Sequence, residues 1–93
     1  MDFGDLRDQA QQRLIEFLLT DLDLGYTYVR MAQTRQEGGD RERLLQNARK
    51  VLEATRRFEG RIADAKAWTA IHERADELQR LIFTELAQIA GIG

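Results

Sequence analysis

Apolar residues recur every three or four positions over three long stretches of the chain, which is the pattern of amphipathic helices. In the first stretch one such line comprises Ile15, Leu18, Leu22, Gly25, Val29 and Ala32, and it predicts a helix over residues 5–36. A second line beside it comprises Leu14, Phe17, Leu24, Tyr28 and Met31. Because the two lines together are wider than the stripe of an ordinary surface helix, we expect this helix to be covered on two sides.

The other two stretches each predict one shorter helix. Asp40 is placed as the N-cap of a helix over residues 40–59, whose apolar line is Leu44, Ala48, Val51, Thr55 and Phe58. A helix over residues 66–89 carries the line Trp68, Ile71, Ala75, Leu78, Ile82 and Ile89, and Gly91-Ile92 fits a Schellman stop after it. Glycines at 38, 39 and 60 mark two short connections, which make successive helices antiparallel neighbours.

These features predict an all-α fold, a three-helix antiparallel up-down-up bundle that forms a single domain over residues 1–93. The first helix is the shared element and contacts both others. At about 1.5 Å per residue it is roughly 48 Å long against roughly 30 Å for the second helix. We therefore expect residues 5–13 to overhang the bundle.

Composition excludes several kinds of active site. The chain has no cysteine and no serine, which rules out disulfides, thiolate metal sites and cysteine or serine nucleophiles. His72 is the only histidine and falls at the edge of the third apolar stripe, where a boundary residue is the favoured interpretation. The acidic residues Asp64, Glu73, Asp76 and Glu77 lack the Glu-x-x-His pairs of di-metal bundles. We expect no catalysis, no metal and no cofactor.

Two features bear on where the protein works. No apolar run is long enough to span a bilayer, and the first residues are acidic where a signal peptide is basic, so we expect a cytoplasmic protein with no membrane contact. Arginine outnumbers lysine 12 to 2, which hints at a high-GC bacterial genome.

Four residues stand out against the apolar pattern. Asp21 lies within the apolar arc of the first helix, where a carboxylate needs a partner. We expect a buried polar pair with an arginine, a tyrosine hydroxyl or Trp68; the alternative is an acid that faces a ligand in a groove. Phe83 lies about 120° from the centre of its stripe and should be partly exposed. With Tyr26 and Leu19 it forms a candidate partner contact, while Trp68 is expected in the core.

Charge is unevenly distributed along the chain. Residues 40–62 carry net +3, between segments of net −3 and −2, and Arg49, Arg56 and Arg57 are a candidate basic face. The favoured interpretation is attraction to the two acidic helices. Nucleic-acid binding is the alternative, although glutamates at 42, 53 and 59 interrupt the arginines and no aromatic residues are interleaved for base stacking.

About 30 residues resemble a known helical hairpin. The pattern Leu24-Gly25-x-x-Tyr28, then Gly39-Asp40, Leu44, Ala48 and Val51-Leu52, resembles the tetratricopeptide repeat. The interval from Gly25 to Gly39 is seven residues longer than in that repeat, which is two helical turns and preserves the helix face. With a third helix, the chain looks more like the microtubule-interacting and trafficking domain.

The resemblance implies a function as well as a fold. It implies a non-catalytic module that binds an extended or helical peptide in a groove between helices, with Gly25 as the small residue that lets the second helix approach. We therefore expect a helical protein-interaction module with a protein or peptide partner, which could also self-associate as a homodimer. A nucleic-acid-binding protein that uses the basic second helix is the alternative.

Overall fold

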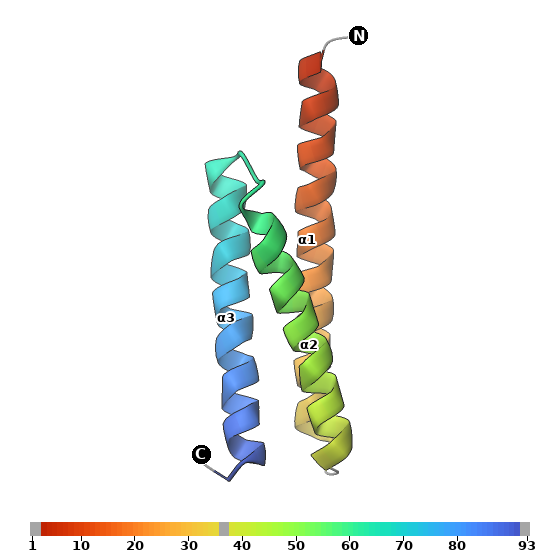
Figure 1. Ribbon diagram of the computed structural model, residues 1–93, viewed down its shortest axis with the longest axis vertical. Helices are drawn as coiled ribbons and strands as arrows, with labels where there is room; N and C mark the ends of the chain where they lie inside the picture. Colours follow the sequence, from red (N-terminus) through yellow and green to blue (C-terminus); the bar gives the residue numbers. More distant parts are fainter. Residues whose placement is uncertain (1–2, 36–37, 92–93) are drawn as a thin grey trace.

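The computed structural model describes residues 3–35 and 38–91 and contains three helices: α1 (Phe3–Thr34), α2 (Gly38–Glu59) and α3 (Ala65–Ile89). They run antiparallel in up-down-up order (Figure 1). No strand occurs in the described part of the chain. The predicted all-α three-helix bundle is confirmed, and each helix begins and ends within two residues of its predicted bounds. Asp40 lies in the first turn of α2 rather than at its N-cap, because the helix begins at Gly38.

The core consists of one apolar line from each helix. The buried residues are Leu18, Leu22, Val29 and Ala32 of α1, Leu45, Ala48 and Val51 of α2, Ile71, Ala75, Leu78 and Ile82 of α3, and Ile62 of the second connection. Removing a leucine- or isoleucine-sized side chain from water contributes about 1.5–3 kcal/mol, so this set is the main source of stability.

At Gly25, α1 lies close to both other helices. A Cβ atom built on Gly25 would lie 2.8 Å from Leu78 Cδ2 and 3.2 Å from Val51 Cγ1. The close approach that the family resemblance implies for Gly25 is therefore present, and it involves α3 as well as α2.

The second apolar line of α1 is covered only in part: Leu14 and Tyr28 pack against the core, but the other three residues do not. Phe17, Leu24 and Met31 are 54%, 43% and 38% exposed. The reason is that α2 and α3 both pack against the first line, so no element of the described chain reaches the far side of this row. Apolar periodicity shows that a row exists, but not that a neighbour covers it.

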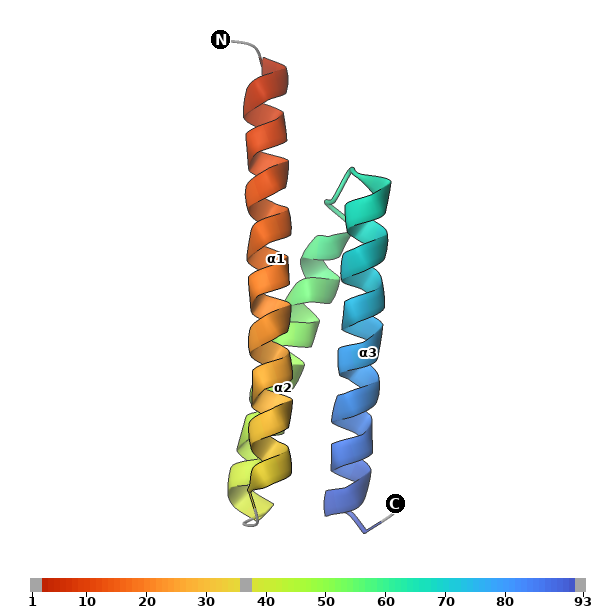
Figure 2. The same cartoon turned by 180° about the vertical axis from the view of Figure 1, so that it is seen from behind.

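The N-terminal part of α1 extends past the ends of α2 and α3 (Figure 2). Residues 4–10 are exposed. The packed part is joined to the second connection at Gln11, whose Nε2 donates to the Arg61 carbonyl oxygen over 2.8 Å and whose Oε1 accepts from the Ala63 N–H over 2.9 Å. The predicted overhang is therefore present and is slightly shorter than residues 5–13.

Both ends of α3 carry a specific cap. The Asp64 side chain is the N-cap and accepts a hydrogen bond from the Ala67 N–H over 2.8 Å. At the other end Gly91 has a φ of 73°, and its N–H donates to the Gln88 carbonyl oxygen over 3.1 Å. The predicted glycine stop is confirmed for Gly91, while Ile92 lies outside the described residues.

Candidate protein-interaction surfaces

An apolar groove runs between α2 and α3. Phe83, at its edge, is 62% exposed. Ile82 is buried and forms the floor, and Leu52 and Leu86 are half-buried. The groove has a volume of about 380 Å³, and its lining is completed by Arg49, Glu53, Arg56 and Gln79. The exposure predicted for Phe83 is confirmed, and the groove gives it an apolar surround.

Tyr26 and Leu19 do not join Phe83 in one patch. The Tyr26 hydroxyl donates to the Arg74 carbonyl oxygen over 2.9 Å and lies 3.3 Å from Glu77 Oε2. Burial, and then the charge of Glu77, raise the pKa of Tyr26. Leu19 is half-buried against the core. The prediction that Tyr26, Leu19 and Phe83 form one patch is therefore wrong. Tyr26 hydrogen-bonds α1 to α3, and Leu19 packs against the core.

Tyr26 lines a different and more polar groove, between α1 and α3. Its volume is about 710 Å³, and its other lining residues are Asp23, Thr27, Val29, Arg30, Gln33, Arg74, Glu77 and Leu81. Arg74 Nη2 donates to Asp23 Oδ1 over 2.8 Å across it, so two of its charges neutralise each other. Although larger, this groove offers less apolar surface than the one at Phe83.

The three arginines of the candidate basic face have different surroundings. Arg56 pairs with Asp76, and its Nη atoms also lie 3.1 Å from Gln79 Oε1 and 3.5 Å from Glu59 Oε2. Hydrogen bonding to Arg56 lowers the pKa of the Asp76 carboxyl. Arg49 lines the α2/α3 groove, and Arg57 is exposed. Since Arg56 is already neutralised by carboxylates of α2 and α3, the three residues do not form one free positive surface.

His72 lies at the boundary of the α3 stripe, as predicted, and packs on Trp68. The two rings stack with centroids 4.5 Å apart and an angle of 12°. His72 Nδ1 lies 3.2 Å from the Glu59 carboxylate. Trp68 is 37% exposed, so the prediction that it lies in the core is wrong. Its ring instead covers the ring of His72, one turn further along α3. Among the described residues, no group of three or more histidine or acidic side chains could hold a metal ion.

Asp21 does not form the buried polar pair that was expected. Its side chain is half-buried and makes no hydrogen bond or ion pair with the residues that the structure describes. The prediction assumed that the apolar arc around Asp21 was covered. Since Phe17 and Leu24 of that arc are exposed, the carboxylate keeps contact with water and needs no cation.

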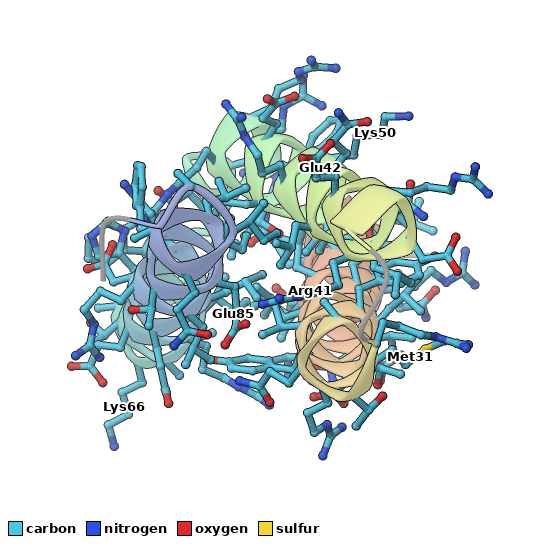
Figure 3. All side chains as sticks on the ribbon, turned by 90° about the horizontal axis from the view of Figure 1, so that it is seen from below. Met31, Arg41, Glu42, Lys50, Lys66 and Glu85 are labelled. Carbon is cyan, nitrogen blue, oxygen red and sulfur yellow. The ribbon has the colours of Figure 1, made fainter. Side chains whose placement is uncertain are left out.

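The sequence interpretation missed a charged residue in the core. Glu85 is only 5% exposed; its carboxylate accepts from Gln33 Nε2 of α1 over 3.1 Å and from Arg41 Nη2 of α2 over 3.3 Å. Figure 3 shows Arg41 reaching across the bundle toward Glu85. A signal existed, because Glu85 follows Leu78 by seven residues and so lies between the lines of Leu78 and Leu81 on the apolar side of α3.

The comparisons with known proteins add no family. No family model, no curated protein and no solved structure matches this chain. In the described helices, no segment has the length and apolarity required to cross a bilayer. The interpretation of function therefore depends on the surfaces described above.

Proposed function

We propose that this protein is a non-catalytic interaction module that binds an apolar segment of a partner protein in the groove between α2 and α3. The observation that carries the proposal is Phe83, a large aromatic side chain that is 62% exposed beside an apolar floor. Exposed aromatic residues next to apolar pockets are typical anchors of protein interfaces.

The dimensions and chemistry of the groove favour a protein segment. A volume of about 380 Å³ holds one or a few large apolar side chains rather than a cofactor with several charged groups. Leu52 and Leu86 supply the apolar walls, and Arg49 and Glu53 place one charge of each sign at the rim. An apolar side chain flanked by polar residues would therefore match it best.

The family resemblance supports the same proposal, since it implies a peptide-binding groove between helices. Binding of nucleic acid through α2 is less well supported. Of the arginines that suggested it, Arg56 already pairs with Asp76 and Glu59, and a phosphate would have to displace these carboxylates.

Selection from a library of random peptides tests the proposal. We expect enriched peptides to share a large apolar residue and to lose at least about tenfold in affinity for the Phe83→Ala variant. Trp68→Ala is the control, because Trp68 is also a large aromatic residue of α3, 37% exposed, but does not line the groove. Selected peptides that bind Phe83→Ala as tightly as the original protein would overturn the proposal.

A further inference from the structure

A row of large apolar side chains on α1 faces water. Phe17, Leu24 and Met31 are all exposed and recur every seven residues, which places them on one line of the helix. Leu6, 46% exposed, lies 18 residues before Leu24, a spacing of five helical turns, so it continues the same line onto the overhang. Four of the six large apolar side chains exposed in the described chain therefore share one line.

A basic row on α2 lies beside this apolar row. The helices α1 and α2 are antiparallel and meet at Gly25 and Val51. Tyr26, which follows Gly25, hydrogen-bonds to α3. Leu52, which follows Val51, lines the α2/α3 groove. At about 100° per residue, the residues before the contact pair, Leu24 and Lys50, must then both face away from α3.

The figures agree with this geometry. Figure 3 looks along the bundle and shows Met31 projecting from α1 and Lys50 from α2 on the side away from α3. Arg43 and Arg57 lie seven residues on either side of Lys50 and share its line. All three basic residues are exposed and make no ion pair or hydrogen bond with any part of the chain that the structure describes.

The two rows are in register. Because the helices are antiparallel and Gly25 meets Val51, Leu24 lies about 3 Å along the bundle from the level of Lys50. The pairs Phe17 with Arg57 and Met31 with Arg43 have the same small offset, and the pairs repeat at intervals of about 10.5 Å. We call these six residues the outer face. Asp21, half-buried between the rows, is a single carboxylate against three cations. The outer face thus repeats one apolar and one positive side chain three times along the bundle.

We propose that the outer face docks an amphipathic helix of another protein, whose apolar stripe is bordered on one side by aspartate or glutamate. Such a helix lies along α1 as a fourth helix of the bundle. It places apolar residues on Phe17, Leu24 and Met31 and carboxylates opposite Arg43, Lys50 and Arg57. The seven-residue interval of both rows is that of helix-on-helix packing, and the unpaired cations require acids on the flank nearer α2.

A second copy of this chain fits the outer face poorly. In a dimer with antiparallel α1 helices, a twofold axis perpendicular to them brings the two basic rows against each other. In a dimer with parallel α1 helices, each basic row faces the Thr20, Thr27 and Thr34 row of the other copy, which offers no negative charge. A nucleic acid would satisfy the cations but leave the apolar row uncovered. An acidic amphipathic helix satisfies both rows.

Three synthetic peptides of about 25 residues, the length from Leu6 to Met31, test the proposal. The first has a leucine stripe flanked by glutamate on one side, the second replaces glutamate by lysine, and the third keeps glutamate but replaces leucine by glutamine. Fluorescence anisotropy of the labelled peptides should show the first binding at least about tenfold more tightly than either of the others. The difference in affinity between the leucine-glutamate peptide and the lysine peptide should decrease as salt is added.

Variants of the outer face separate its two rows. Leu24→Gln should weaken the leucine-glutamate peptide about tenfold, and the double change Arg43→Glu with Lys50→Glu should make the protein prefer the lysine peptide. These side chains are exposed, so circular dichroism should show unchanged helices. Phe83→Ala should leave the affinity for these peptides unchanged, since the outer face does not include the α2/α3 groove. This variant therefore distinguishes docking on the outer face from binding in the α2/α3 groove.

Four results would overturn the proposal. The first is equal affinity for the glutamate and lysine peptides, and the second is an affinity unaffected by Leu24→Gln. The third is light scattering that shows a dimer which Leu24→Gln dissociates, because it would assign the outer face to a second copy. The fourth is a single-stranded oligonucleotide that displaces the leucine-glutamate peptide and depends on Lys50 but not on Leu24, because it would assign the face to nucleic acid.

Discussion

At the scale of single residues, the absence of one methyl group at Gly25 sets how closely three helices can approach. The atoms nearest to a Cβ at this position are Leu78 Cδ2 and Val51 Cγ1, and both residues belong to the core. Two effects of a substitution by alanine oppose each other here. Alanine favours the helix by up to about 1 kcal/mol, while overpacking a filled core costs about 1–3 kcal/mol.

We expect the packing cost to be the larger effect, because Leu78 is fully buried and cannot rotate away freely. Gly25→Ala should therefore lower the free energy of unfolding by about 1 kcal/mol in urea denaturation. Gly39→Ala is the matched control: nothing lies within 4 Å of a Cβ there, so alanine should raise stability by up to about 1 kcal/mol. Equal stabilisation by both substitutions would show that α1 does not depend on a small residue at position 25.

At the scale of elements, the number of helices and their core lines could be predicted because the 3.6-residue period marks the face that a helix buries. The line through Leu18, Leu22 and Val29 is buried as expected. The parallel line through Phe17 and Leu24 has the same period but is exposed. The period alone does not show which apolar line another helix will cover. The covered line depends on where α3 packs.

The surroundings of polar residues were harder to predict for the same reason. Whether Tyr26 is a contact residue or a hydrogen-bond donor depends on Arg74 and Glu77, which are about fifty positions away in the chain. The α2/α3 groove likewise joins residues of two helices. Phe83 alone could be predicted as exposed, because its own helix places it off the stripe.

The start of α3 depends on one side chain. Asp64 accepts from the Ala67 N–H and so satisfies a donor that the helix leaves unpaired. Asp64→Ala should lower the free energy of unfolding by about 1 kcal/mol, measured by thermal or urea unfolding. Asp64→Asn is the control, because asparagine caps helices nearly as well. If Ala and Asn cost the same, charge rather than the hydrogen bond would account for the effect.

The pair between Arg56 of α2 and Asp76 of α3 should make stability depend on acid pH. Because hydrogen bonding to Arg56 lowers the pKa of Asp76 in the folded state, its contribution is present above the unfolded pKa of about 3.9. It is lost as pH falls through the lower folded pKa. Asp76→Asn should thus be less stable than the original protein at neutral pH, and the difference should vanish in strong acid.

Melting curves at a series of pH values measure this difference. Glu73→Gln serves as the control, since Glu73 is exposed and has no partner among the described residues, so its removal should not alter the pH dependence. A difference between Asp76→Asn and the original protein that persists unchanged at the lowest pH would contradict the assigned pair. Because Asp76 is exposed, added salt should reduce the effect.

At the scale of the whole molecule, the bundle is a rod of 56 × 19 × 16 Å. A rod this narrow gives each helix two neighbours and a large solvent-facing side. For α2 and α3 that side is mainly polar. For α1 it includes the apolar row of the outer face, so the chain has more apolar surface than three helices can cover, and both proposed interaction surfaces follow from this shape.

The rod is held together at one end by the charged contact of Glu85 with Arg41 and Gln33, which joins all three helices. Removing one charge from a buried pair costs more than removing both, because the remaining ion stays desolvated without its partner. Glu85→Gln should therefore lower the free energy of unfolding by about 2 kcal/mol, less than for a fully buried pair because Arg41 is partly exposed.

The double change Glu85→Leu with Arg41→Met should recover most of that loss, because it removes both charges and adds apolar contacts to the core. Arg41 Nε, which is buried and has no hydrogen-bond partner among the described residues, would no longer need one. Urea denaturation of the single and double variants measures the difference. If the double variant were as unstable as Glu85→Gln, removing the second charge would bring no gain, and the unpaired charge of Arg41 would not be the cause of the loss in Glu85→Gln.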